Sequence, residues 1–192
     1  MNDKTGAKEL SGESSQPVLN VWLRGYLCKM KGGRCKDLPR LTWSGLLVTA
    51  VGSLAGLGLV CLLSSYYQLP LLLPSLGASA VLLYAACHVQ MAQPRNVLGG
   101  HLISAFVGVS AYQLFGGQWW VIAVGVTTAI LAMTVTRTLH APGGATAFVA
   151  IYNGQGFDFI IAPVGMGVVC LLVIALLINN LASQRKYPDY WL

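Results

Sequence analysis

Two short runs of small residues carry the side chains that could bind a ligand. Residues 74–81 and 142–148 share a core that reads Gly-Ala-Ser-Ala in the first run and Gly-Ala-Thr-Ala in the second, 67 positions later. A proline before such a run favours a helix start, because proline lacks the N–H that the first helical turn cannot pair. Unpaired N–H groups and the positive end of the helix dipole attract anions. The two runs therefore predict an anion site built from helix N-termini.

We expect an ion to contact the glycines, the hydroxyls and the ionisable side chains of these runs. Glycine lets an ion approach the backbone closely, and a hydroxyl one turn into the helix adds a donor. Arg137 and His140 stand directly before the second run, and ionisable side chains near a membrane are functional candidates. A snorkelling topology anchor is the alternative for Arg137, and a capping or packing histidine is the alternative for His140. The predicted substrate-binding residues are Ser75, Gly77, Ser79, Arg137, His140, Pro142, Gly143, Gly144 and Thr146.

The sequence lacks the groups that other kinds of site need. Asp158 is the only acidic residue in the range 41–184, no nucleophile stands beside a base, and no glycine-rich phosphate loop follows a strand. Six residues separate Cys28 from Cys35, with no histidine nearby, which is not a zinc spacing. His101, after two glycines, is expected to pack or to hydrogen-bond inside the protein. We therefore expect no enzyme, no cofactor and no metal ion.

The elements that position these runs are expected to be membrane helices. The chain is 55% hydrophobic and only 9% charged, whereas soluble domains carry about 25% charged residues. Apart from histidine, the ionisable acids and bases from residue 41 to 184 are Arg95, Arg137 and Asp158. This composition excludes a soluble fold and predicts an all-α, polytopic membrane helical bundle. Membrane lipid is an expected partner and nucleic acid is not. The sequence leaves open whether the chain forms a homo-oligomer.

Six apolar segments are candidate spans. A helix that crosses the hydrocarbon core needs about 20 residues. The first, third and sixth segments are long enough, and the fourth is nearly long enough. The second and fifth segments are of marginal length. If all six cross, the loop arginines lie inside with Arg185-Lys186, as the positive-inside rule favours. If the two marginal segments are re-entrant, only four cross. The predicted spans are 43–63, 70–88, 97–115, 119–135, 139–152 and 159–180.

The matched runs divide the bundle into two halves, residues 43–116 and 118–184. Each half has three segments with the marginal one in the middle, so an odd number of crossings inverts the second half. Inverted repeats are a transporter architecture in which the substrate lies near the midplane. We expect the two short helix starts to point at each other there. A chance match is the alternative, because small residues are common in packed membrane helices.

The flanking segments set the predicted domains and orientation. Basic residues beside the first and last spans favour cytoplasmic N- and C-termini in a multi-pass protein of the plasma (inner) membrane. Tyr187, Tyr190 and Trp191 are expected at the membrane interface. The predicted domains are a disordered polar tail (1–16), a basic interfacial amphipathic segment (17–40), a single transmembrane domain (41–184) and a cytoplasmic tail (185–192).

The second run and its neighbours resemble a known family. Residues 137–147 read Arg-Thr-Leu-His-Ala-Pro-Gly-Gly-Ala-Thr-Ala and resemble the signature of the HPP family, in which His-Pro-Pro precedes Ala-Gly-Ala-Thr-Ala. The stretch 93–101 and the end 187–191 look like the same family, and the resemblance covers about residues 20–192. Ala141 replaces the first proline of the signature and Gly143 replaces its alanine. The bend before the helix is therefore expected to be less rigid here.

This resemblance implies an integral membrane protein and suggests a substrate. Family members of plants and cyanobacteria are linked to nitrite transport across chloroplast or cell membranes. Nitrite is a small anion of the kind that helix starts favour. The resulting hypothesis is a transporter or channel for a small inorganic anion, with nitrite first. The alternative is a non-transporting membrane scaffold or regulatory subunit, and an intramembrane enzyme is disfavoured because its residues are lacking.

Overall fold

The computed structural model describes residues 18–30, 42–68 and 70–191, in two compact units that divide between residues 40 and 41. In the first unit, helix α1 (Val18–Met30) forms where the sequence predicts an amphipathic helix, and its described side chains from Leu23 to Met30 are exposed. The predicted disordered tail (1–16) lies outside the described residues. The second unit contains every other element.

The second unit is a helical bundle, and all regular structure in the described residues is helical, which confirms the predicted fold class. Three helical stretches are long and apolar enough to cross a membrane: Trp43–Tyr67, Pro94–Phe115 and Ile160–Leu181. They correspond to the first, third and sixth predicted spans. The elements are α2 (Trp43–Tyr67), α3 (Pro74–Ala80), the π-helical turn η1 (Val81–Ala85), the 3-10 turn η2 (Gln90–Ala92), α4 (Pro94–Phe115), α5 (Trp119–Val135), α6 (Ala141–Tyr152), the π-helical stretch η3 (Ile160–Gly165) and α7 (Met166–Leu181).

The helix starts follow the local sequence. Thr42 caps α2, with its hydroxyl accepting from the N–H of Gly45 at 3.1 Å. Helices α3, α4 and α6 each have a proline in their first turn. Proline is tolerated there because an N–H in the first turn has no hydrogen-bond acceptor within the helix. The predicted helix starts at the two matched runs are therefore confirmed.

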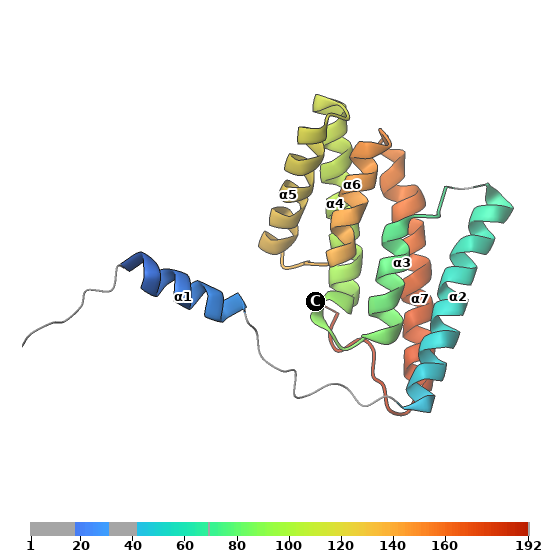
Figure 1. Ribbon diagram of the computed structural model, residues 1–192. Helices are drawn as coiled ribbons and strands as arrows, with labels where there is room; N and C mark the ends of the chain where they lie inside the picture. The colour runs from blue at the N-terminus through green and yellow to red at the C-terminus, as the bar shows by residue number, and fades with distance from the viewer. Residues whose placement is uncertain (1–17, 31–41, 69, 192) are drawn as a thin grey trace, which may run out of the picture. The chain divides into compact units, whose positions relative to one another are not determined.

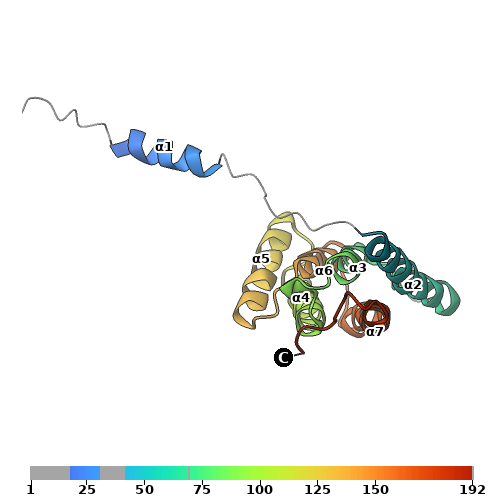
Figure 2. The ribbon, with the colours of Figure 1, turned by 90° about the horizontal axis from the view of Figure 1, so that it is seen from below.

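The helices form two rows when they are viewed along the bundle (Figure 2). One row contains α5, α6, α3 and α2 in that order, and α4 and α7 lie along one side of it. Successive segments alternate in direction, so α2, α4 and α6 run one way while α3, α5 and α7 run the other (Figure 1). Neighbouring segments of the chain are therefore antiparallel throughout the second unit.

The two central segments are short. The α3–η1 segment covers residues 74–85 and α6 covers residues 141–152, which are 12 residues each. Twelve residues rise about 18 Å, less than the ~30 Å of a hydrocarbon core. These two short helices lie next to each other and run in opposite directions, and the longer helices α2, α4, α5 and α7 flank them on three sides.

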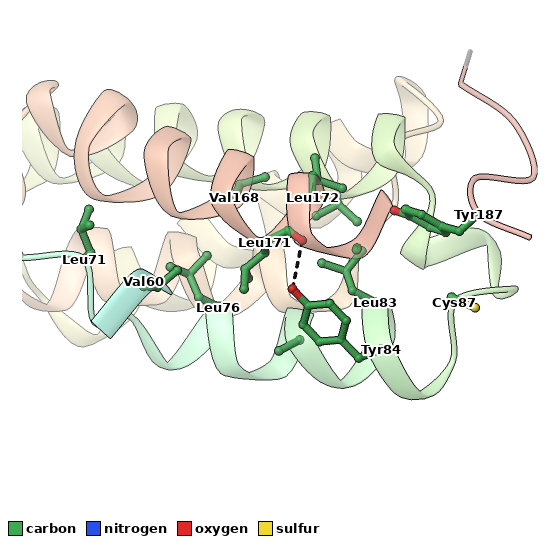
Figure 3. Close-up of a cluster of buried hydrophobic side chains, with 13 residues drawn as sticks. Val60, Leu71, Leu76, Leu83, Tyr84, Cys87, Val168, Leu171, Leu172 and Tyr187 are labelled. Atoms are coloured by element: carbon green, nitrogen blue, oxygen red, sulfur yellow. Dashed lines mark hydrogen bonds between the residues drawn. The ribbon is translucent and has the colours of Figure 1, made fainter. Parts of the chain in front are cut away.

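The main apolar core joins α2, α3, η1 and α7 (Figure 3). Tyr84 is fully buried there and donates its hydroxyl to the carbonyl of Leu171 at 3.0 Å. Its ring lies against Gly52 and Gly56, where a Cβ would collide with it. Glycine at these two positions of α2 therefore gives room to an aromatic ring from η1.

A ridge of small residues brings α4 and α6 together. A Cβ on Gly143 would lie 2.9 Å from the Gly100 carbonyl oxygen and 2.9 Å from Ser104 Oγ. A Cβ on Gly108 would lie 2.8 Å from the carbonyl oxygen of Ala147. Backbones approach this closely only where both helices carry small side chains.

The C-terminal segment packs against the bundle. The guanidinium of Arg185 donates to the carbonyls of Tyr84 (2.7 Å) and Gly45 (2.9 Å), which joins η1 to the start of α2. Tyr187 is only 2% exposed and donates its hydroxyl to the carbonyl of Ala92 at 2.6 Å. The expectation that Tyr187 marks the membrane interface is therefore wrong, because its ring is enclosed by protein.

Candidate functional site

Five hydroxyl and imidazole side chains meet where α3, α4 and α6 pack together. Ser79 Oγ lies 2.8 Å from Nε2 of His101 and 2.8 Å from Nε2 of His140. Nδ1 of His101 lies 2.8 Å from Thr146 Oγ1, which in turn lies 2.9 Å from Ser75 Oγ. We call these five residues, Ser75, Ser79, His101, His140 and Thr146, the polar cluster.

The polar cluster is closed off from solvent and fully hydrogen-bonded. Ser75 is 1% exposed and the other four residues are 0% exposed. His140 Nδ1 lies 2.7 Å from the carbonyl oxygen of Met91, and the two imidazole rings are 4.8 Å apart between centroids. No buried side-chain nitrogen or oxygen of the described residues lacks a partner. Because an unpaired buried polar group is costly, this bonding holds the three helices together.

Local sequence explains how the side chains converge. Ser75 and Ser79 stand four residues apart on α3, so they share one face of the helix. His140 precedes α6 in extended conformation and makes no side-chain cap, so its ring is free to turn toward α3. On α4, a Cβ at Gly100 would lie 2.5 Å from the Cβ of His140. Glycine at that position therefore makes room for the histidine.

The two short helix starts do not point at each other. Ser75, in the first turn of α3, lies beside Thr146 in the second turn of α6. Ser79 lies beside His140, at the start of α6. The two N-terminal ends therefore overlap side by side over about 6–9 Å. This corrects the expectation that the helix ends face each other across an ion, because hydroxyl and imidazole side chains fill the overlap.

Gly77 and Gly144 face away from the polar cluster. Gly77 lies two residues from Ser75 and Ser79, and Gly144 lies two residues before Thr146. Two residues along an α-helix turn the side-chain direction by about 200°. A Cβ at either glycine would meet nothing within 4 Å. These two glycines therefore do not share a helix face with the cluster hydroxyls, and their predicted contact with an ion stays a prediction.

The other predicted residues lie around the cluster. Pro142 is buried in the first turn of α6, and Gly143 beside it is used for the contact with α4. Arg137 is exposed, with a left-handed backbone (φ 56°), and its side chain lies in a pocket outside the cluster. The structure thus brings four of the nine predicted residues, Ser75, Ser79, His140 and Thr146, into one site.

His101 is the residue of this site that sequence reasoning did not select. It was expected to pack or to hydrogen-bond, and it does hydrogen-bond, but it also links Thr146 to Ser79. The signal available in the sequence was an ionisable residue inside an apolar span, which is a functional candidate by default. Among the residues that the structure describes, no group of three or more His, Cys, Asp and Glu could hold a metal ion.

A pocket lies near each end of the polar cluster. The first, of about 500 Å³, we call the arginine pocket; it contains Met91, whose carbonyl lies against His140. The second, of about 240 Å³, we call the amide pocket; it contains Leu73, two residues before Ser75. The arginine pocket is lined by Leu82, Val89, Gln90, Met91, Asn96, Thr134, Arg137 and Leu139. The amide pocket is lined by Ser64, Pro70, Leu72, Leu73, Asn153, Gln155, Phe159 and Pro163.

The two pockets lie at opposite ends of the bundle. Residues of the arginine pocket come from the end of η1, the start of α4 and the end of α5, at the bottom of Figure 1. Those of the amide pocket come from the ends of α2 and α6 and the start of α3, at the top. The polar cluster therefore lies between two pockets that each carry polar side chains.

Comparison with known proteins identifies relatives over most of the chain. The family profile described as HPP, transmembrane region, matches residues 38–188. A curated transmembrane protein of Dictyostelium discoideum is 36% identical over 191 residues, which cover 90% of this chain and 59% of that protein. A second transmembrane protein of Dictyostelium discoideum is 37% identical over 132 residues, which cover 65% of this chain and 46% of that protein. The chain thus spans about half the length of these relatives. No solved structure matches it.

Proposed function

This chain belongs to the HPP transmembrane family, and we propose that it is a transporter or channel for a small inorganic anion, with nitrite as the first candidate. The observation that carries the proposal is the polar cluster, five buried hydroxyl and imidazole side chains held between two short antiparallel helices. Nitrite comes from the resemblance to family members that are linked to nitrite transport.

The chemistry of the polar cluster favours an anion over a cation. Its hydroxyls and imidazoles supply neutral donors, and the described residues of α3, η1, η2, α4, α5 and α6 include no carboxylate. The first turns of α3 and α6 add the positive ends of two helix dipoles. A hydroxyl rotates at little cost, so Ser75, Ser79 and Thr146 are able to turn from one another toward an ion. The ion would then replace the internal hydrogen bonds of the cluster.

The two pockets support a route through the bundle. On one side, Arg137 in the arginine pocket would attract an anion to the level of Met91, whose carbonyl lies against His140. On the other side, the amide pocket offers the side chains of Asn153 and Gln155 near the start of α3. A route through the cluster therefore needs the closed hydrogen bonds to open toward one pocket at a time, as alternating access requires.

An inverted repeat is part of the proposal. Helix α4 of the first half packs with α5 and α6, and α7 of the second half packs with α2 and α3 (Figure 2). The third helix of each half thus packs against the other half, as a two-fold axis through the centre of the bundle would require. Tyr84 packs against glycines of α2, and Ile151, 67 positions later, packs against a glycine of α5.

Equivalent contacts between the halves follow the same spacing. Gly143 on α6 packs against Gly100 on α4, and Leu76 on α3 packs against Gly167 on α7. Residues 76 and 143 are 67 positions apart, as are residues 100 and 167. A chance match of four small residues does not explain why side chains outside the matched core make equivalent contacts. These contacts support a duplication, and inverted duplications are typical of transporters.

We propose that the end of the bundle carrying the arginine pocket faces the cytoplasm. Arg95 donates to the carbonyl of Thr136 at 3.3 Å, next to Arg137, and Arg185 lies at the same end against Gly45. Arginines gather on the cytoplasmic side of membrane proteins.

Cysteine labelling in whole cells tests this orientation. On a cysteine-free background, an impermeant maleimide added outside should label Asn153→Cys and should leave Gln90→Cys unlabelled, because these exposed positions lie at opposite ends. Labelling of Gln90→Cys alone would reverse the orientation. Labelling of both after membrane lysis is the control for reactivity.

Uptake of nitrite into liposomes containing the purified protein tests the function. We expect uptake above that of protein-free vesicles, saturation with nitrite concentration, and competition by other small anions of similar size. A non-transporting scaffold or regulatory subunit predicts uptake equal to that of protein-free vesicles. Nitrous acid crosses lipid by itself, so the comparison is made at pH 8, where little of it is present.

A further inference from the structure

The partners of the two histidines determine where the hydrogens of the neutral cluster lie. The Met91 carbonyl only accepts, so His140 carries a hydrogen on Nδ1, and its Nε2 accepts from Ser79. Ser79 has one hydrogen to give, so its oxygen accepts from Nε2–H of His101. Nδ1 of His101 then accepts from Thr146. Atoms of the chain itself thus set both tautomers.

Each hydroxyl that donates to a histidine has a second acceptor within reach. Ser79 Oγ lies 3.0 Å from the carbonyl oxygen of Ser75, and Thr146 Oγ1 lies 2.9 Å from Ser75 Oγ. When a proton adds to Nε2 of His140, Ser79 turns its hydrogen to the Ser75 carbonyl. When a proton adds to Nδ1 of His101, Thr146 turns its hydrogen to Ser75 Oγ. In both cases one N–H bond forms, no O–H bond breaks, and the histidine and its hydroxyl stay paired.

The surroundings of the histidines contain no fixed charge that would hold such a proton. The described elements packed against His101 and His140 carry no Asp or Glu. Arg95, at the start of α4, donates to the carbonyl of Thr136, and Arg137 lies in the arginine pocket. Tyr84 on η1 turns its hydroxyl to the carbonyl of α7. A proton alone would therefore be an unpaired buried positive charge, and an anion alone an unpaired negative one.

A proton and an anion bound together neutralise each other in the buried site. Opposite charges in contact offset part of the cost of removing each from water. By linkage, each ligand then raises the affinity of the other by the same factor. Two protons are disfavoured, because the two rings are only 4.8 Å apart. The geometry thus suits one proton per anion.

We propose that His101 and His140, bridged by Ser79, bind one proton with each anion, so that the protein is a proton–anion symporter. This inference rests on the proposed anion transport and adds its coupling. The proton comes from water in the pocket through which the anion enters. It rests on an imidazole nitrogen while the site is closed, and it leaves to water in the opposite pocket with the anion. The pair moves no net charge.

Transport measured at fixed membrane potentials tests the coupling. Liposomes containing the full chain, a trapped pH dye and a potassium gradient with valinomycin are given nitrite at pH 8. We expect the interior to gain one proton per nitrite. We also expect the accumulation of nitrite to be independent of the membrane potential. For an anion that moves without a proton, a potential of about −100 mV inside would lower the equilibrium accumulation on the order of 50-fold. Protein-free vesicles are run in parallel and give the leak of nitrous acid.

The outcomes separate the coupling from the transport itself. Uptake that follows the potential without acidification would overturn the coupling and leave anion transport standing. Uptake equal to that of protein-free vesicles would overturn both proposals. His101→Gln and His140→Gln retain a donor and an acceptor but cannot gain a proton near neutral pH. We expect the proton-to-nitrite ratio of any residual uptake to fall below one in both variants. A ratio of one in both would remove the histidines from the mechanism.

Discussion

Replacing Gly143 with valine should destabilise the bundle far more than replacing Gly144 with valine. A Cβ at this position would lie 2.9 Å from the carbonyl oxygen of Gly100, Ser104 Oγ and Met133 Sδ. The methionine is able to move, but the carbonyl belongs to the backbone of α4, so the two helices would have to separate. Overpacking of this kind costs about 3 kcal/mol. We expect a clear loss in the thermal unfolding midpoint of the detergent-solubilised protein and little monodisperse protein on size exclusion.

The neighbouring glycine provides a matched control. Gly144→Val adds the same atoms to the same helix, but a Cβ there meets nothing within 4 Å. We expect its unfolding free energy to stay within about 0.5 kcal/mol of wild type. Equal losses in the two variants would show that the packing of α6 against α4 is not as described. If Gly144→Val folds but abolishes nitrite uptake, the ion lies against Gly144 and the polar cluster is not its site.

Much of the fold could be predicted because it follows from the apolar segments and from the residues that begin and end them. The fourth predicted span, 119–135, coincides with α5, and the first, third and sixth differ from their helices by a few residues. The short central helices were marked by their length and by the prolines that begin them. In membrane helices the apolar run and its breaking residues are local properties, so one sequence suffices to locate them.

The arrangement of the site was harder to predict from the sequence, because it depends on how α3 and α6 are aligned along their axes. The matched runs correctly indicated that α3 and α6 cooperate, but they do not encode the overlap that brings Ser79 level with His140. Shifting the pair by two turns would have placed their ends face to face. The roles of Gly77 and Gly144 could have been predicted, however. Residues two apart on a helix face opposite sides, so neither glycine shares a face with Ser79 or Thr146.

Replacing Thr146 with valine should slow nitrite uptake far more than replacing it with serine. The Thr146 hydroxyl joins α6 to His101 on α4 and to Ser75 on α3, and its residue is 0% exposed. Valine keeps the shape of threonine but leaves both partners without this bond. An unmade buried hydrogen bond costs about 1–3 kcal/mol, which corresponds to roughly 5- to 150-fold in rate if the loss falls on the transport step.

Serine at the same position separates a polar role from a packing role, because the two roles predict opposite orders. Thr146→Ser keeps the hydroxyl and loses one methyl group, whereas Thr146→Val keeps the volume and loses the hydroxyl. If the polar cluster binds the ion, uptake by the serine variant should stay within about threefold of wild type, since the donor is preserved. The valine variant should then be much slower. If α6 only packs here, valine should match wild type and serine should lose stability by about 1 kcal/mol through the missing methyl group. Uptake rates and unfolding midpoints of both variants, measured on the same preparations, decide between these orders.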